Sequence, residues 1–223
     1  MAHRVAKGLV GGCVLLLGAS ITGCGAPQYT YIANSSASTY FKVPYGWHKI
    51  SPSALEAALA AATGSGTSAW NVAYEAGPHP TAGDFLSFDT SQPFVFAEIG
   101  ALTSSASQNL SYDALRDFFL PVSSTARSDA AEEAAEDHET DPLSNFKQIR
   151  DEVLDLRQGV HGVRETFDYT YTDGTTDTFD EIALTNADQT EVYLLVLHCT
   201  TACYNNDQAE INDVMTSFTI GSP

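Results

Sequence analysis

Residues 160–171 read Val160-His161-Gly162-Val163-Arg164-Glu165-Thr166-Phe167-Asp168-Tyr169-Thr170-Tyr171, a run in which β-branched and aromatic residues recur as they do in β-strands. Similar runs lie before and after it, at 153–156, 176–184 and 191–198. Asp173-Gly174 and Asn186-Ala187-Asp188 supply turn residues between these runs. The last third of the chain is therefore predicted to form successive antiparallel strands joined by hairpins.

The flanking sequence adds helices and further strands. Asn205, with Gln208 three residues later, resembles a capping box, and the apolar residues of 211–218 then mark one face of a closing helix. Upstream, 40–43, 70–74 and 94–102 have strand patterns, and Ser51 with Pro52 begins a helix. This order predicts an α+β fold, a mainly antiparallel sheet with helices packed on its faces.

The domain that these elements form is expected to be single and to span 40–220. Within it, 122–145 is Ser-rich and then Ala- and acid-rich, and no strand fits there. This segment is predicted to be an acidic insertion, either an exposed loop or a solvated helix.

Four short segments resemble known proteins. Phe41-Lys42-Val43-Pro44-Tyr45-Gly46-Trp47, Gly159 to Phe167 and Ile211 to Phe218 are similar to the opening strand and turn, the central strand and the closing helix of the PsbP-like fold. Cys199-Thr200-Thr201-Ala202-Cys203-Tyr204 is similar to a group of actinobacterial lipoproteins of unknown function. The resemblance implies a PsbP-like sandwich, a fold that serves for assembly or binding more often than for catalysis. It carries over no catalytic residue.

The N-terminal segment has the pattern of an export signal. Arg4 and Lys7 precede the uncharged run 8–23, which ends in Ile21-Thr22-Gly23-Cys24. This ending resembles a bacterial lipoprotein signal. The resemblance implies that 1–23 are removed, that the Cys24 thiol carries a diacylglyceryl group, and that the protein is held on the extracytoplasmic face of the cell membrane.

Two alternatives concern the same segment. Val10-Gly11-Gly12-Cys13 also fits the motif, but it leaves far fewer apolar residues after Lys7 than the roughly 7–15 of a signal core. An uncleaved membrane helix is the other alternative. The uncharged run is shorter than the roughly 20 residues that span a bilayer, and it contains several glycines.

The charge of the mature chain excludes some partners. After residue 23 the chain has eight basic and 28 acidic residues, a net charge of −20. Nucleic acid is excluded as a partner, because no basic patch is present. Attraction to anionic lipid headgroups by net charge is also excluded, so the membrane attachment depends on Cys24. Residues 24–39 are polar and are expected to form a flexible tether.

The two remaining cysteines, Cys199 and Cys203, are predicted to form a disulfide, because an even pair in an exported protein usually does. Zinc binding with His198 is the alternative, but the nearby sequence supplies no fourth ligand. A second metal hypothesis concerns Asp129, Glu132, Glu133 and Glu136, which would share one helix face. The sequence lacks the glycine turn of a calcium loop, and a solvated segment explains these acids equally well. No cofactor is predicted.

Two functions are compatible with this sequence. The first is a non-enzymatic binding or scaffold module of the cell envelope that contacts a protein, glycan, lipid or small apolar ligand through Trp47, Trp70 and Tyr74, if these are exposed. The alternative is an envelope hydrolase that uses carboxylates of the 165–181 hairpin. Those carboxylates, at 168, 173, 177 and 180, would otherwise be the polar face of two exposed strands.

Overall fold

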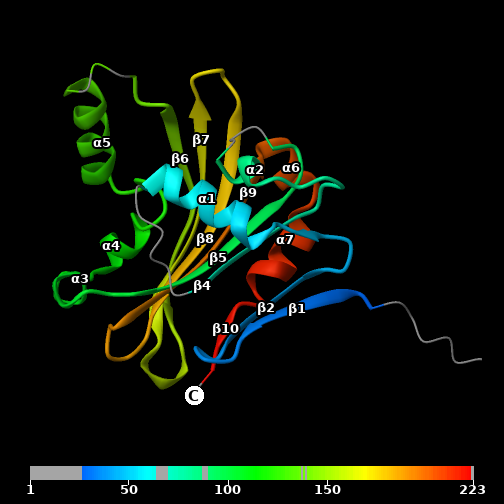
Figure 1. Cartoon of the computed structure of the whole chain (residues 1–223). Coiled ribbons are helices and arrows are strands. Elements are labelled where there is room, and N and C mark those ends of the chain that lie inside the picture. Colours follow the sequence, from blue (N-terminus) through cyan, green and yellow to red (C-terminus); the bar gives the residue numbers. More distant parts are fainter. Residues whose placement is uncertain (1–26, 64–69, 87–89, 137, 139, 222–223) are drawn as a thin grey trace, which may run out of the picture.

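The computed structural model describes residues 27–63, 70–86, 90–136, 138 and 140–221 (Figure 1). Cys13, Cys24 and the whole signal segment 1–23 lie outside the described residues. The fold is α+β, as predicted.

Seven antiparallel strands form the main sheet, in the order β3-β4-β5-β9-β8-β7-β6 (Figure 1). Their bounds are β3 (His48–Lys49), β4 (Trp70–Glu75), β5 (Phe94–Ala101), β6 (Leu143–Asp155), β7 (His161–Tyr171), β8 (Thr176–Thr185) and β9 (Glu191–Thr200). The predicted hairpins β7–β8 and β8–β9 are confirmed by ten and nine residue pairs in register. β6 is longer than the predicted strand 153–156 and begins inside the expected acidic insertion.

A second sheet is small and has the order β1-β2-β10, with β1 (Tyr29–Asn34), β2 (Thr39–Pro44) and β10 (Thr219–Ile220). It lies at the lower right of the molecule in Figure 1. The expectation of a flexible tether over 24–39 is wrong for 29–39, because β1 pairs with β2 along its whole length. The strand was not predicted because Ile32 is its only buried hydrophobic residue, so the sequence shows little alternation of apolar and polar side chains.

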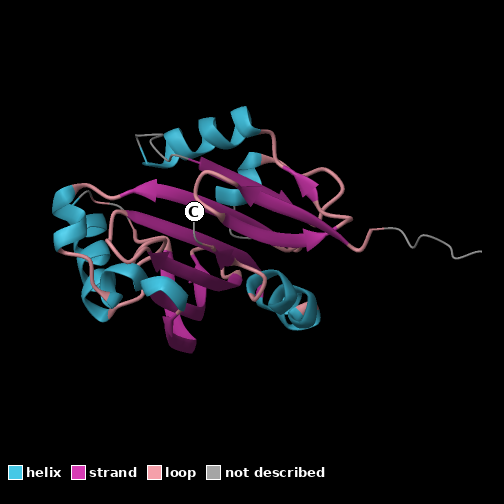
Figure 2. Cartoon of the chain, turned by 90° about the horizontal axis from the view of Figure 1, so that it is seen from below, coloured by secondary structure: helices cyan, strands magenta, loops and turns pink. Residues whose placement is uncertain are grey.

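The helices cover both faces of the main sheet. They are α1 (Pro52–Thr63), α2 (Ala82–Leu86), α3 (Ser104–Gln108), α4 (Tyr112–Arg116), α5 (Ser124–Glu136), α6 (Thr201–Asn206) and α7 (Gln208–Met215), with a short 3-10 turn η1 (Arg157–Gly159). Figure 2 shows the helices at the flanks of the strand layers.

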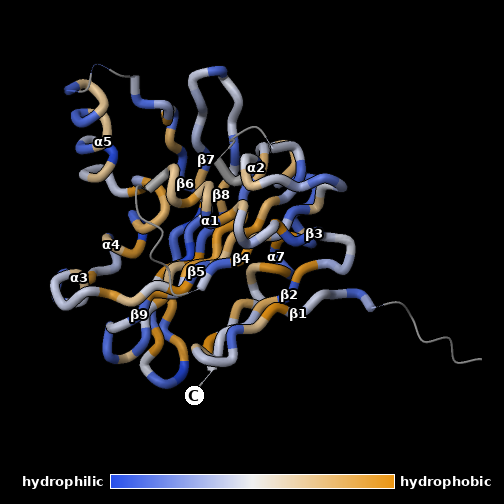
Figure 3. The backbone as a smooth tube through the Cα atoms, viewed as in Figure 1, coloured by the Kyte–Doolittle hydropathy of each residue, from blue (hydrophilic) through white to orange (hydrophobic). Residues whose placement is uncertain are grey.

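Two hydrophobic clusters result, one on each face. On the face covered by α6, α7 and the small sheet, which we call the α7 face, Phe41, Leu195 and Met215 belong to one cluster. On the opposite face, the α4 face, Leu55 and Leu115 belong to the same cluster as the sheet residues. β5 and β9 are therefore hydrophobic along most of their length. β7 and β8 also carry charged residues, and hydrophilic stretches are visible among the central strands in Figure 3.

The acidic segment contains a helix. α5 holds Asp129, Glu132, Glu133 and Glu136, and none of its described side chains is buried. Of the two predicted alternatives, the structure has the solvated helix. No group of His, Cys, Asp or Glu suited to hold a metal ion occurs among the described residues.

Cys199 is the residue before the last of β9, and Cys203 lies in α6 on the α7 face. The two sulfur atoms are joined in a disulfide. Thr200, the last residue of β9, is also the N-cap of α6, and its hydroxyl oxygen accepts the backbone N–H of Cys203. The covalent bond thus connects the sheet to the first helix of the closing pair.

Candidate binding site

Two of the three aromatic residues predicted as ligand contacts belong to the core. Trp47 is 6% exposed, and its indole Nε1 donates to Oε1 of Glu210 at 3.1 Å. Tyr74 is 9% exposed, and burial raises the pKa of its hydroxyl. Both side chains are therefore unavailable to a ligand. Trp70 is half-buried and packs against the same cluster with part of its ring.

Trp70 lines a pocket of about 430 Å³, which we call the Trp70 groove. Trp70 begins β4 and lies opposite Ile99 of β5, which forms the apolar floor. The other walls are the β1–β2 turn, residues 33–37, and the side chain of Glu191 at the start of β9. One aromatic ring thus faces a largely polar enclosure.

The polar groups of the groove are held by local hydrogen bonds. Oδ1 of Asn34 accepts the backbone N–H groups of Ser36 and Ala37, at 3.0 and 3.1 Å, which fixes the turn. The amide nitrogen of Asn34 has no hydrogen-bond partner among the described residues and remains a donor. Oε2 of Glu191 accepts the hydroxyl of Tyr193 at 2.6 Å.

A second pocket, of about 280 Å³, shares Ser36, Ala37 and Glu191 with the groove. It continues past Tyr193 toward the β8–β9 turn, where Asn186 and Asp188 line it. Burial, followed by the hydrogen bond to Glu191, raises the pKa of Tyr193, so its hydroxyl stays protonated. The two pockets are therefore neighbours at this end of the α7 face, separated by the residues that they share.

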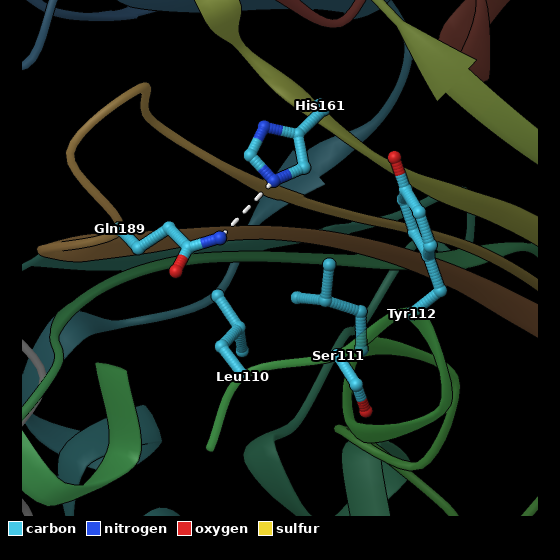
Figure 4. A pocket seen from close by; sticks show the side chains of 6 residues that line it. Leu110, Ser111, Tyr112, His161 and Gln189 are labelled. Carbon is cyan, nitrogen blue, oxygen red and sulfur yellow. Dashed lines mark hydrogen bonds between the residues drawn. The ribbon is translucent and has the colours of Figure 1, made fainter. Parts of the chain in front are cut away.

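The α4 face has its own pocket at the same end of the sheet (Figure 4). It measures about 290 Å³ and is lined by Leu110, Ser111, Tyr112, Leu115, His161 and Gln189. Nδ1 of His161 lies 2.9 Å from the carbonyl oxygen of Gly159, to which it donates. Nε2 is then left to accept the amide of Gln189 at 3.5 Å. The imidazole is thereby held in one tautomer beside apolar walls.

The hairpin carboxylates do not form the polar face of exposed strands, and that expectation is wrong. Asp168, Asp177 and Asp180 are all buried, because β7 and β8 are covered on both faces. Asp173 differs, since it lies exposed in the turn and accepts the backbone N–H of Thr175.

The buried carboxylates are divided between the two faces, and each has a partner. On the α7 face Arg164 donates to both oxygens of Asp180 at 3.0 and 2.8 Å, and Asp168 accepts the hydroxyl of Thr178 at 2.7 Å. On the α4 face Asp177 lies 3.4 Å from Nδ1 of His198. None of the three pockets described above includes one of these acids. The hydrolase alternative therefore finds no carboxylate of the 165–181 hairpin in these three pockets.

A further carboxyl pair, Glu165 and Glu181, is buried beneath α4. Burial is the main cause that raises the pKa of Glu165 to about 7; the charge of Asp151 adds to this rise, and the guanidinium of Arg116 opposes it at 3.2 Å. Burial and the charge of Glu165 raise the pKa of Glu181 as well. This pair belongs to the interior and lines none of the three pockets described above.

The sequence analysis missed Asn34, Glu191, His161 and Gln189 as site residues. All four lie within or beside turns that join paired strands. The sequence signalled the turns at 173–174 and 186–188, but it gave no sign that the β1–β2 turn and the β8–β9 turn meet at one end of the molecule.

No family model matches the sequence, and no curated protein matches it. In structure the chain is similar to cyanobacterial PsbP from Synechocystis sp. PCC 6803, with 14% identity, a TM-score of 0.48, and coverage of 95% of this chain and 99% of that one. It is also similar to LpqN of Mycobacterium tuberculosis, a protein involved in cell envelope biogenesis, with 13% identity, a TM-score of 0.45, and coverage of 87% and 91%. A third similar structure is the Ran-binding protein Mog1p of Saccharomyces cerevisiae, with 7% identity, a TM-score of 0.42, and coverage of 86% and 95%. No described helix has both the length and the apolar character needed to cross a membrane.

Proposed function

We propose that this protein is a lipid-anchored binding module on the extracytoplasmic face of the membrane, and that it holds a glycan in the Trp70 groove. The anchor rests on the signal pattern that ends at Cys24. The Cys199–Cys203 disulfide supports an oxidising location, because structural disulfides persist outside the reducing cytosol.

The observation that carries the binding proposal is the half-buried indole of Trp70 in an otherwise polar enclosure. A pyranose ring has an apolar face of C–H groups and a rim of hydroxyls. The indole offers a flat apolar surface for that face, while the Asn34 amide and the Glu191 carboxylate can donate to and accept from the rim. Few, well-placed polar groups around an apolar contact are typical of small-ligand sites.

The groove and the proposed anchor lie at opposite ends of β1. Tyr29 begins this strand shortly after Cys24, and Asn34 ends it at the groove. A strand of this length spans about 20 Å. The groove is thereby held near the membrane surface without being adjacent to the lipidated residue.

Ligand binding is tested by the fluorescence of Trp70 itself. Because the chain has two tryptophans, Trp47→Phe leaves Trp70 as the only one. We expect soluble peptidoglycan fragments to shift its emission saturably, and we expect Trp70→Ala to abolish binding measured by calorimetry. Gln189→Ala, in the pocket of the α4 face, is the control and should bind as the parent does. An unchanged emission, or undiminished binding by Trp70→Ala, contradicts the proposal.

The anchor is tested separately by metabolic labelling with a fatty acid. Cys24→Ala should abolish acyl labelling and leave the unprocessed precursor, whereas Cys13→Ala should be labelled and processed normally. Normal labelling of the Cys24→Ala protein would show that the anchor lies elsewhere or does not exist.

A further inference from the structure

The outer face of the small sheet is rich in tyrosine. In the β1–β2 register Tyr31 lies opposite Lys42, and Tyr40 lies opposite Ala33. Of the alternate residues of both strands, Ile32, Thr39, Phe41 and Val43 are buried. We call the outward set the tyrosine face; it consists of Tyr29, Tyr31, Tyr40 and Lys42, with Tyr45 in the turn that follows β2.

Three of these side chains, Tyr31, Tyr40 and Tyr45, are exposed, whereas Tyr29 and Lys42 are half-buried. Tyr31 is 73% exposed and Tyr45 is 61% exposed, and Tyr40 is also among the exposed large side chains. The Lys42 ammonium lies 3.9 Å from the centre of the Tyr29 ring, and the Tyr29 hydroxyl donates to Asp213 at 3.0 Å. Four of the ten tyrosines of the chain thus share one exposed surface.

Charge is distributed unevenly around this face. Residues 25–55 contain Lys42 and Lys49 and no Asp or Glu, so all 28 acids of the chain lie from Glu56 onward. The tyrosine face therefore lies in the acid-free segment 25–55, which a negatively charged surface does not repel. One acid from another segment, Asp213, borders the face. The rest of the domain is strongly acidic and is repelled by such a surface.

The chain length to the proposed anchor sets the distance of this face from the bilayer. Four residues separate Cys24 from Tyr29. Five steps of extended chain span at most about 18 Å. If Cys24 carries the lipid, β1 begins within reach of the headgroup region.

We propose that the tyrosine face docks on the lipid headgroup region and fixes the orientation of the domain on the membrane. This inference rests on the proposed anchor at Cys24. Tyrosine suits such an interface, because its ring is apolar and its hydroxyl remains hydrated; Tyr and Trp are enriched at membrane–water interfaces for this reason. Lys42 adds attraction to lipid phosphates, and the anchor supplies the attachment that the face itself is too small to provide.

The test uses the full-length lipidated protein in vesicles of phosphatidylethanolamine and phosphatidylglycerol. Tyr31→Trp places a reporter on the tyrosine face, and Tyr112→Trp places a matched reporter at an exposed tyrosine of the α4 face. The fluorescence of each variant is compared with that of the parent protein, which already contains Trp47 and Trp70. We expect nitroxide labels near the headgroups to quench the Tyr31→Trp reporter more than labels at the bilayer centre do. The Tyr112→Trp reporter should show no lipid-dependent quenching.

A combined Tyr40→Ser and Tyr45→Ser change in the Tyr31→Trp protein should reduce that quenching while acyl labelling and flotation with vesicles persist. If the labelled protein floats but the Tyr31→Trp reporter is no more quenched than Tyr112→Trp, docking is wrong and the anchor stands. If Cys24 is not labelled, the proposed function itself fails. If the emission of the Tyr31→Trp reporter changes on dilution of the protein and is not quenched by the lipid labels, a second copy of the chain covers the face. This result also overturns the inference.

Discussion

Glu165 and Glu181 are directly opposite each other on β7 and β8, and both side chains are buried on the α4 face. Their pKa values are raised from the ordinary value of 4.5, that of Glu165 to about 7. Two carboxylates this close disfavour double ionisation, so near neutral pH the pair retains a proton. Two acids in register at the centre of a buried sheet thus make the stability of the fold depend on pH.

We predict that the free energy of unfolding falls as pH rises from about 5 to 8. A carboxyl with a raised folded-state pKa binds a proton more tightly in the folded chain, so its contribution is lost between the ordinary value of 4.5 and the folded value of about 7. Glu75, whose pKa burial and Asp84 raise to about 7, acts in the same direction. Thermal unfolding at pH 5.5 and pH 8 measures the difference.

Glu181→Gln should raise the melting temperature at pH 8 and reduce its dependence on pH, because the neutral amide needs no proton. Glu132→Gln, on the exposed helix α5, is the control and should leave the pH dependence unchanged. A steeper pH dependence in Glu181→Gln would contradict this account.

The ion pairs of β7 differ in burial, and their removal should differ in cost. Asp180→Ala leaves the guanidinium of Arg164 buried without its bidentate partner, so we expect a loss of about 3–5 kcal/mol in unfolding free energy. Lys147→Ala breaks the ion pair with Asp168. Because the Lys147 side chain is largely exposed, we expect a loss of less than about 1 kcal/mol in unfolding free energy. Urea denaturation of both variants makes the comparison, and equal losses would refute it.

The Cys199–Cys203 disulfide closes a short loop and should contribute modestly. Chain-entropy reasoning gives about 2 kcal/mol for a loop of this length. We expect the double change Cys199→Ser and Cys203→Ser to fold and to unfold at a lower urea concentration, without loss of acyl labelling at Cys24. Mass spectrometry of the non-reduced exported protein should show the two cysteines linked, and free thiols would disprove the bond.

The sequence predicted the hairpins of the last third because period, composition and turn residues agree there. Gly174 has a positive φ of 89° in the β7–β8 turn, which is the conformation that the Asp-Gly pair indicates. The same reasoning missed β1, where alternating tyrosines and threonines were interpreted as tether. Only the pairing with β2, which lies later in the sequence, shows that the strand exists.

The burial of the hairpin acids could not be predicted from the local sequence pattern. Asp180 is buried because Arg164 from the neighbouring strand and Tyr204 from α6 both donate to it, and these partners are 16 and 24 residues away. A pattern of alternating acids and apolar residues is the same for an exposed face and for a buried, paired one. Likewise, the sequence does not show which of Trp47 and Trp70 is exposed. The packing in the folded protein buries the indole of Trp47 and leaves that of Trp70 half-buried.

Gly162 is required by the close approach of two strands. A Cβ at this position would lie 2.0 Å from the carbonyl oxygen of Ala183 and 2.8 Å from Cα of Leu184, both backbone atoms of β8 that cannot move without breaking the pairing. We therefore expect Gly162→Ala to cost about 1–3 kcal/mol or more, as overpacking of a core does. Gly100→Ala is the matched control in β5, because its Cβ would meet only side-chain atoms, of Val192 at 3.5 Å and of Glu98 at 4.0 Å, which are ordinary contact distances. Thermal unfolding should show a lowered midpoint for Gly162→Ala and an unchanged or slightly raised one for Gly100→Ala; equal midpoints would mean that β7 and β8 are farther apart than the structure shows.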